Sequence, residues 1–298
     1  MATENTSRRP GGGTGDPGGG GSGAVVNQMR SLELLWGESP RPRRGPKPRL
    51  SIDRIADTAI TIADTEGLDA LSMQRIAGEL GYTTMSLYRY VPGKAQLLDV
   101  MIDRAVGQPP TPEAPDGTSL PWRAQVEAIA WAVWRVFMRH PWFLSMQFAG
   151  PPIGPNHLAW MEAGTSAFTR GGLSDVEAFC AFAFVQGSIR DWARAETESA
   201  AGAPATEGGS PTAPQEQPES AYATALRTYA VPDRYPTLSR IVAAGMFDPP
   251  QRSGAADAHS EEDRGAFAGV ESESFRFGIV FPLRRFLDGI ESYVAGQG

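Results

Sequence analysis

The sequence predicts an all-α fold in two parts, a small N-terminal helix-turn-helix domain and a larger helical domain. Two observations lead to this prediction. Apolar residues recur at helical spacing in the segments that contain enough of them to form a core, and no segment shows the alternating pattern of a half-buried strand. In addition, two short helical segments, residues 72–80 and 83–89, are separated by a tight turn at Gly81.

Glycine and proline are abundant but concentrated in parts of the chain. The 298 residues include 34 Gly and 25 Pro, and nine of the first 23 residues are Gly. Residues 196–220 contain no large apolar side chain, so they cannot bury enough surface to offset the entropy lost on ordering. We expect a disordered tail and arm over residues 1–48, in which residues 24–36 can form a short helix. We also expect mobile loops near residues 197–219 and 249–266.

The sequence excludes several classes of protein. Its longest uninterrupted apolar run, residues 178–185, has eight residues, whereas a membrane-spanning helix needs about 20. With one cysteine and three scattered histidines, we expect no disulfide framework, no metal site and no cofactor. We expect Cys180 to be an inert buried thiol among apolar neighbours. No apolar signal-peptide segment is present, so we expect a cytoplasmic protein.

The chain also lacks the motifs of common enzymes. It contains no glycine-rich phosphate loop after a strand and no serine nucleophile motif. We therefore expect no catalytic residues and no enzymatic activity.

The first domain, expected over residues 49–107, carries helix signals at its boundaries. Ser51 and Ser72 are placed to cap helices whose inner faces have apolar residues at helical spacing. Gly81 supplies the left-handed residue that ends the second of these helices. Thr83 is placed to cap a third helix of about two turns, and a fourth helix follows a Pro-Gly break.

The helix pair has two interpretations, a plain three-helix packing unit or a DNA-binding helix-turn-helix. The second is favoured because Thr83, Thr84 and Ser86 are small polar residues that can approach base edges without steric conflict. Tyr88 and Tyr90 follow as hydrogen-bond donors suited to phosphates.

Lys94 stands at the start of the next helix, where the helix macrodipole disfavours a cation. An anion held jointly by Lys94 and the free amide groups of the helix N-terminus would explain a lysine there.

Basic residues also gather ahead of the first helix. Five of the nine residues 41–49 are Arg or Lys and none is acidic, whereas residues 105–298 carry 14 basic and 22 acidic side chains. The basic run is either a solvated linker or an arm on an extended Pro/Gly backbone. In the second case, Arg43, Arg44 and Lys47 would enter a narrow minor groove of DNA.

The strongest pattern in the chain spans residues 71–82 (LSMQRIAGELGY) and 85–94 (MSLYRYVPGK), followed by Leu97-Leu98. Here the sequence resembles the DNA-binding domain of the tetracycline-repressor (TetR) family, over about residues 50–105. The resemblance implies a set of DNA contacts. Bases are met by Thr84, Met85 and Ser86, phosphates are held by Tyr88, Tyr90 and Lys94, and Gln74 on the preceding helix also reaches DNA.

Two of these residues depart from the family pattern. Tyr90 stands where histidine is commonest, although its hydroxyl can still donate to a phosphate. Met85 occupies a place often taken by a small residue, so it serves either as an apolar contact for a thymine methyl group or as packing.

The second domain, expected over residues 121–298, resembles the C-terminal domain of the same family less specifically. Helical spacing predicts helices at residues 122–139, 156–170, 174–198, 222–229, 235–244 and 275–294, with a kink at Pro282 in the last. The resemblance implies a ligand-binding and dimerisation domain. Helices 174–198 and 275–294 would then form a four-helix interface between two subunits.

This domain is rich in bulky apolar side chains, which form either ordinary core or the walls of an apolar ligand cavity. The candidate walls are Trp131, Trp134, Phe137, Phe143, Met146, Trp160 and Phe168. Four polar residues lie among them and either orient a ligand or face solvent: Arg135, Gln147, Gln186 and Arg190.

The resemblance, together with these observations, implies a ligand-responsive transcriptional regulator. The expected form is a homodimeric repressor that binds a palindromic double-stranded DNA operator and is released by a small aromatic or polycyclic effector. The alternative is a DNA-binding activator or architectural protein without a small-molecule inducer.

Overall fold

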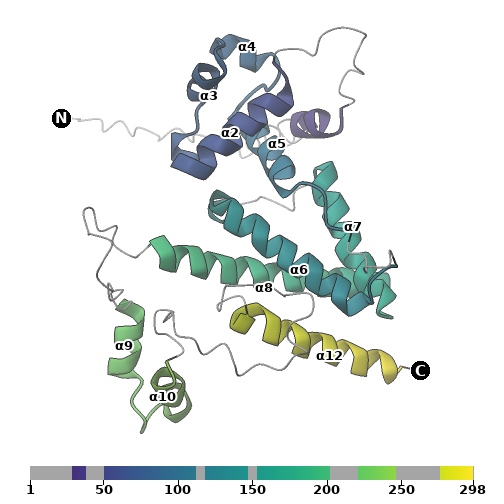
Figure 1. Cartoon of the computed structure of the whole chain (residues 1–298), viewed down its shortest axis with the longest axis vertical. Helices are drawn as coiled ribbons and strands as arrows, with labels where there is room; N and C mark the ends of the chain where they lie inside the picture. The colour runs from purple at the N-terminus through teal and green to yellow at the C-terminus, as the bar shows by residue number, and fades with distance from the viewer. Residues whose placement is uncertain are drawn as a thin grey trace, which may run out of the picture.

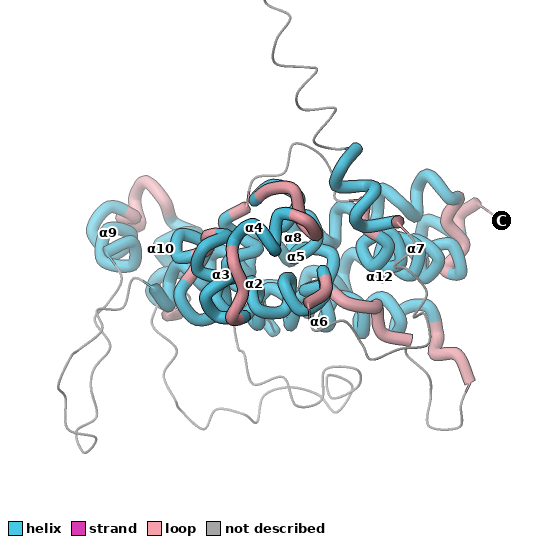
Figure 2. Tube along the Cα trace, turned by 90° about the horizontal axis from the view of Figure 1, so that it is seen from above, coloured by secondary structure: helices cyan, strands magenta, loops and turns pink. Residues whose placement is uncertain are grey.

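The computed structural model describes residues 29–37, 50–111, 118–146, 153–201, 221–245 and 276–297. Within these ranges every regular element is a helix, and no strand is present (Figure 2). This confirms the predicted all-α class. The arm residues Arg43, Arg44 and Lys47, the loop at 249–266, most of the loop at 197–219 and Gln147 lie outside the described ranges.

The N-terminal domain, hereafter the head, is the group of short helices at the top of Figure 1. It contains α2 (Ile52–Glu66), η1 (Leu68–Ala70), α3 (Met73–Leu80), α4 (Thr84–Tyr88) and α5 (Lys94–Val106). The predicted caps form, since Ser51 Oγ accepts from Arg54 N at 3.2 Å and Ser72 Oγ accepts from Arg75 N at 3.1 Å. The apolar faces of the helices meet in one core, which holds the fully buried residues Ile55, Ile76, Leu87, Leu97 and Met101.

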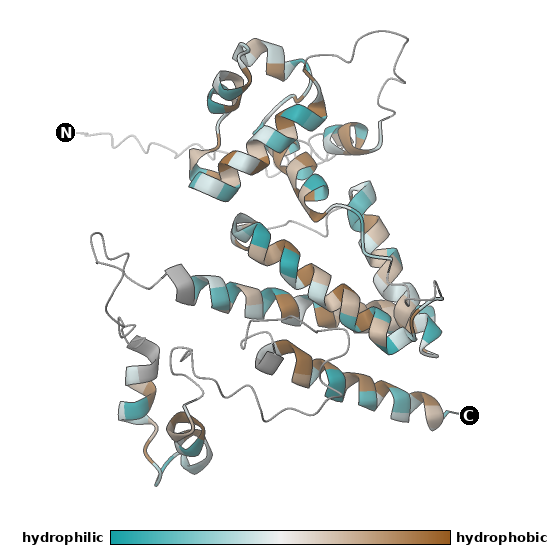
Figure 3. Cartoon of the chain, in the orientation of Figure 1, coloured by the Kyte–Doolittle hydropathy of each residue, from teal (hydrophilic) through white to brown (hydrophobic). Residues whose placement is uncertain are grey.

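The C-terminal domain, hereafter the body, is built from longer helices. It contains α6 (Trp122–Arg139), the 3-10 helix η2 (Pro141–Ser145), α7 (Pro155–Arg170), α8 (Asp175–Ala201) and α12 (Phe281–Ala295). These helices carry both hydrophobic and hydrophilic residues along their length (Figure 3), and their apolar faces share a core around Trp134 and Phe168. Helix α8 continues to Ala201, three residues beyond its predicted end and into the segment expected to be a mobile loop.

The helix type changes beside Pro282, the position of the predicted kink. A π-helical turn, η4 (Arg276–Val280), precedes α12, and Pro282 occupies the first turn of α12. Proline lacks an amide hydrogen and is tolerated at this place, because the first N–H groups of an α-helix have no intrahelical acceptor. The change from a π-helical to an α-helical turn therefore stands next to Pro282, and the bend predicted there stays a prediction.

Two shorter helices, α9 (Ala221–Tyr229) and α10 (Pro236–Ala243), pack against each other beside the body (Figure 1). Their bounds agree with the predicted helices at 222–229 and 235–244 to within one residue. They place no side chain in the site discussed below.

One helix lies in the segment expected to be a disordered tail and arm. It covers residues 29–36, inside the short helix expected at 24–36. Ser31 Oγ hydrogen-bonds to Asp99 on α5 of the head, and the Trp36 indole donates to the Ile153 carbonyl of the body at 2.8 Å. The helix therefore contacts both domains, so residues 29–36 belong to the folded protein.

The structure contradicts the expected burial of Cys180. Its side chain is exposed, because α8 carries apolar residues on two faces and only one of them packs on α6 and α7. The apolar sequence neighbours of Cys180 are likewise divided, with Phe182 buried and Phe179 exposed.

Candidate nucleic-acid interface and apolar cavity

The turn between α3 and α4 is fixed by backbone hydrogen bonds. Gly81 has φ +74° and ψ 32°, the left-handed conformation that a residue with a Cβ adopts only at a cost. The Tyr82 amide donates to the Ala77 carbonyl at 2.9 Å, which is the bond of a Schellman motif. The side chain of Leu87 is fully buried and attaches α4 to the head core. These contacts set the angle at which α4 leaves α3.

The remaining residues of α4 form its outer surface. Met85 is 74% exposed and Tyr88 is 44% exposed. Thr83 is exposed, and Thr84 and Ser86 are half-buried. The hydroxyl groups of Thr83 and Ser86 lie 2.9 Å apart and hydrogen-bond to each other. Thr83 occupies the predicted N-cap position, but its side chain accepts no hydrogen bond from a backbone amide.

The exposure of Met85 decides between its two predicted roles. A side chain that packs in the head core would be buried, as Leu87 is, and 74% of Met85 faces solvent. The packing role is thus excluded, and contact with an external group is the role that fits.

The candidate phosphate contacts lie around the same surface. Tyr90 is half-buried against the head core. Lys94 Nζ donates to the Leu71 carbonyl at 3.0 Å. An ammonium group has three donors, so two remain for an anion. Gln74 is exposed on α3.

Two other cations of the head, Arg75 and Arg104, are held in ion pairs. Arg75 on α3 contacts Glu66 at 2.9 Å and Glu79 at 3.0 Å. Arg104 on α5 pairs with Asp53 at 2.9 Å and with Asp57 on α2, and its hydrogen bond to Asp57 raises the pKa of its guanidinium. These pairs join helices of the head.

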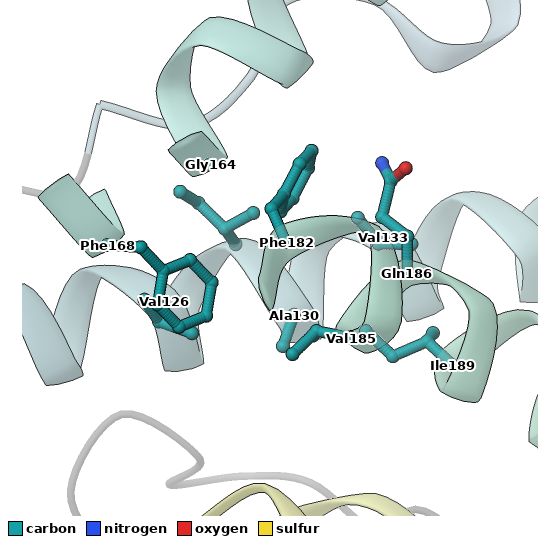
Figure 4. Close-up of a pocket in the computed structure, with 10 residues that line it drawn as sticks. Val126, Ala130, Val133, Gly164, Phe168, Phe182, Val185, Gln186 and Ile189 are labelled. Carbon is teal, nitrogen blue, oxygen red and sulfur yellow. The ribbon is translucent and has the colours of Figure 1, made fainter. Parts of the chain in front are cut away.

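The body contains a small apolar cavity between α6, α7 and α8 (Figure 4). Its walls include Ile129 and Val133 from α6, Gly164 and Phe168 from α7, and Phe182 and Gln186 from α8. Among the described residues, Gln186 is the only polar one that lines it. The cavity has room for about one water molecule, so in this conformation its walls are closed together.

Phe168 alone among the seven predicted wall residues lines this cavity. Four of the others are buried elsewhere in the core: Trp134, Phe137, Phe143 and Trp160. Trp131 and Met146 are half-buried and pack against that core. Of the polar candidates, Arg135 is exposed, and Arg190 donates to the Met146 carbonyl at 2.8 Å.

Helix α7 connects the cavity to the last helix of the head. At its N-terminus, the Asp103 carboxylate of α5 accepts a hydrogen bond from the His157 amide at 3.0 Å. One turn later, the Trp160 indole donates to the Gly107 carbonyl at 2.9 Å. The same helix carries the wall residues Gly164 and Phe168. A shift of α7 at the cavity would therefore move α5.

His157 lies at this junction with an unusual environment. Its Nδ1 atom is buried and has no hydrogen-bond partner among the described residues. Burial lowers the pKa of His157, and the negative charge of Asp103 offsets this only in part. The neutral imidazole is therefore the form that this junction accommodates.

A second junction was not identified from the sequence. The Asp64 carboxylate of α2 accepts from the Trp142 indole at 2.6 Å and lies 2.7 Å from His140 Nδ1. His140 directly follows α6, and Trp142 lies in η2. The sequence offered one signal, a histidine next to a proline and a tryptophan directly after a long helix, but it did not indicate the acceptor.

Large apolar side chains remain exposed along α8 and α12. Trp192 on α8 is 41% exposed, and five others are between 46% and 74% exposed: Val176, Phe179, Phe184, Phe281 and Tyr293. The two helices are neighbours, since the rings of Phe184 and Phe286 lie 5.0 Å apart and Tyr293 donates to Glu177 at 2.6 Å. We call this set of five residues the α8–α12 face. Single exposed apolar residues are normal on the surface of a monomer, whereas a cluster of this kind is typical of an interaction surface.

Two protein-family models match the chain. One, for bacterial regulatory proteins of the tetR family, matches residues 55–101. The other, for the tetracyclin repressor-like C-terminal domain, matches residues 111–259. The chain belongs to the TetR family. The resemblance found in residues 71–94 is thereby confirmed, and so is the weaker one in the body.

Relatives within the TetR family cover nearly the whole chain. The HTH-type transcriptional repressor DrrR1 of Streptomyces coeruleorubidus is 37% identical over 284 residues, which are 95% of this chain and 93% of DrrR1. The structure is similar to that of ActR from Streptomyces coelicolor in its apo form, with a TM-score of 0.59, 25% identity, and coverage of 85% of this chain and 100% of ActR. ActR in complex with actinorhodin gives a TM-score of 0.56 at 25% identity, covering 81% of this chain and 95% of that one.

As a TetR-family member, the protein is a DNA-binding transcriptional regulator with a helix-turn-helix head and a helical ligand-binding body. In the described ranges, His, Cys, Asp and Glu side chains nowhere gather in groups of three that could hold a metal ion. None of the described helices combines the length and hydrophobicity that a membrane crossing requires.

Proposed function

We propose that this TetR-family protein is a homodimeric repressor whose α4 enters the major groove of a palindromic operator, and that an apolar aromatic molecule releases it. The observation that carries the proposal is α4 itself. Its buried Leu87 fixes the helix to the head, while Met85 and Tyr88 project from it into solvent. The 37% identity to a repressor over 95% of the chain supports the repressor role.

The outer surface of α4 divides into two kinds of DNA contact. Thr83, Thr84, Met85 and Ser86 belong to the first turn, the part of a recognition helix that meets base edges. Phosphate contacts from Tyr88, Tyr90 and Lys94, with Gln74 on α3, would orient the head on the duplex. Thr84→Ala should therefore change the preferred sequence, whereas Lys94→Ala should weaken binding to every sequence and lower the salt slope by about one.

Stability must be measured beside affinity for the Lys94 variant, because Lys94 Nζ also holds the Leu71 carbonyl. A double variant, Thr84→Ala with Lys94→Ala, that binds DNA as the natural protein does would contradict this placement of the head.

The basic run provides a separate contribution to affinity. Arg43, Arg44 and Lys47 lie directly ahead of the head, where an extended arm can reach the minor groove. Because residues 29–36 pack on both domains, the test should replace these three side chains by alanine and leave the preceding helix in place. The loss of affinity should be greatest on operators with A·T-rich flanks.

Dimerisation through the α8–α12 face would cover its exposed apolar side chains. Such an arrangement places two helices from each subunit in a four-helix interface. The two heads would then contact successive major grooves about 34–36 Å apart on a palindromic site.

The effector site is proposed at the cavity between α6, α7 and α8. Its lining residues are apolar apart from Gln186, a lining that suits an aromatic ligand. A ligand larger than a water molecule must displace walls such as the Phe182 ring to enter. Since α7 contacts both the cavity and α5, that displacement would change the position of the head and favour the DNA-free state.

The test starts from a DNA sequence selected from a random pool by the full-length protein. Affinity for it is then measured with and without actinorhodin, the ligand of the similar ActR, and a panel of other apolar aromatic compounds. We expect an inducer to reduce DNA affinity by about 5- to 150-fold, the usual range of allosteric coupling. Compounds that stabilise the body without changing DNA affinity would instead favour the activator or architectural alternative.

A pair of variants assigns the effect to the cavity. Gln186→Leu should weaken effector binding and leave DNA binding intact, because Gln186 lines the cavity in the body and α4 belongs to the head. Ser188→Ala is the matched control, since the Ser188 hydroxyl bonds to the Phe184 carbonyl of its own helix at 3.0 Å and does not line the cavity.

A further inference from the structure

We propose that each half of the operator is read chiefly through the 5-methyl groups of thymines, with Met85 as the side chain that contacts them. This inference rests on the proposed DNA-binding role of α4. It goes further by assigning the base chemistry that α4 recognises.

The recognition surface lacks the side chains that read guanine. The commonest specific contact to guanine is a bidentate hydrogen bond from Arg or Lys to its O6 and N7 atoms. Residues 83–88 (TTMSLY) contain no charged side chain. Hydroxyl groups can bond to any base, and those of Thr83 and Ser86 already bond to each other at 2.9 Å.

The Arg and Lys side chains nearest to α4 are not placed to contact guanine. Arg75 on α3 is held by Glu66 and Glu79 at 2.9 and 3.0 Å. Lys94 lies at the start of α5, outside α4, and its two remaining donors are assigned to a phosphate. Arg89 is exposed, but it stands at the C-cap of α4, opposite the N-terminal turn that meets bases. Its position suits a phosphate.

Met85 has the chemistry of a thymine contact. It is the second residue of α4 and is 74% exposed, so its thioether chain is available to an apolar group in the groove. The thymine C5-methyl is the apolar group that the major groove presents. Tyr88, three residues on, shares the same side of the helix and is 44% exposed. Met85 and Tyr88 together form an apolar surface on α4, and the unbranched Met85 side chain can adapt its shape to a methyl group.

The experiment removes one methyl group at a time. An operator is selected from a random pool with the full-length protein, and each selected thymine of one half-site is replaced by uracil, which differs only in lacking the methyl. We expect at least one replacement to weaken binding by about fourfold, the loss that corresponds to one buried CH₂ group. With Met85→Ala, the thymine and uracil forms at that position should bind equally. Met85→Leu should retain the discrimination.

Three outcomes would overturn the inference. The first is a natural protein indifferent to every uracil replacement, and the second is a Met85→Ala variant that discriminates as well as the natural protein. The third is a half-site whose affinity depends on guanine N7, detected by replacement with 7-deazaguanine. If no sequence is enriched at all, the proposed DNA-binding function fails together with this inference, whereas enrichment without methyl sensitivity refutes this inference alone. Because Met85 is exposed, its variants should unfold as the natural protein does, and this is checked by thermal denaturation.

Discussion

The Trp142 indole of the body donates a hydrogen bond to the Asp64 carboxylate of the head, with 2.6 Å between the nitrogen and the oxygen. Trp142 is only 5% exposed, whereas 27% of the Asp64 side chain is exposed, so the bond is buried on the Trp142 side. The same carboxylate lies 2.7 Å from Nδ1 of the buried His140. One side chain of α2 thus holds two polar groups of the segment after α6, 76 and 78 residues away in the sequence.

Asp64→Ala should destabilise the protein by about 1–3 kcal/mol, because it leaves the buried Trp142 N–H without its acceptor. Urea unfolding followed by tryptophan fluorescence measures the loss. Asp69→Ala is the control, since Asp69 is exposed and a surface substitution changes stability by less than about 0.5 kcal/mol. Equal stability of the two variants would show that the junction contributes nothing.

Gly164→Ala should destabilise the body. A Cβ at this position would lie 2.2 Å from the ring of Phe182, so the cavity wall would have to move. Overpacking of this kind costs about 1–3 kcal/mol. Gly78→Ala in α3 is the matched control, because its Cβ meets no atom within 4 Å, and there alanine should stabilise the helix by up to about 1 kcal/mol. Denaturant unfolding should show a lower free energy of unfolding for Gly164→Ala and a higher one for Gly78→Ala than for the natural protein.

Gly81→Ala should reduce both the stability of the head and operator affinity. The left-handed conformation at this turn costs a residue with a Cβ about 1–2 kcal/mol, and relief of that strain would change the angle between α3 and α4. Gly81→Asn should lose less, since asparagine tolerates this conformation. Thermal unfolding and operator titration measure the stability and the DNA affinity of both variants. Equal values for Gly81→Ala and Gly81→Asn would contradict the prediction.

His157 should make stability depend on pH near neutrality. Its pKa in the folded protein is lowered by burial, whereas in the unfolded chain it is near the ordinary value of about 6.5. The unfolded state therefore binds the proton more readily, so the contribution to stability is complete above about pH 6.5 and is lost as the pH falls below it. Urea unfolding between pH 5 and 8 should show this fall in the natural protein and a flatter profile in His157→Gln.

Charge placed on the α8–α12 face should prevent dimerisation. Val176→Glu with Phe179→Glu puts two carboxylates among side chains that are 74% and 46% exposed, so the monomer should fold as before. We expect a dimer for the natural protein and a monomer for the double variant in sedimentation at micromolar concentration. Leu158→Glu, an exposed apolar residue on α7, should remain dimeric. A natural protein that sediments as a monomer would refute the proposed interface.

Features of the head that depend on near neighbours in the chain could be predicted from the sequence. The caps at Ser51 and Ser72 and the left-handed Gly81 involve groups at most a few residues apart, so residue types and spacing are enough to place them. The helices of the body were located to within a few residues for the same reason.

Contacts between distant segments were decided only by the tertiary structure. Helical spacing shows that a face is apolar but does not show what covers it. This is why Cys180 was wrongly expected to be buried and why Phe168 alone of seven candidate aromatic and methionine residues lines the cavity. The bond from Lys94 to Leu71 and the junction at Asp64 join residues 23 to 78 positions apart. The sequence by itself determined the family, the helices and the recognition surface, because these depend on local order. The cavity, the junctions and the exposed faces were determined by how the helices pack.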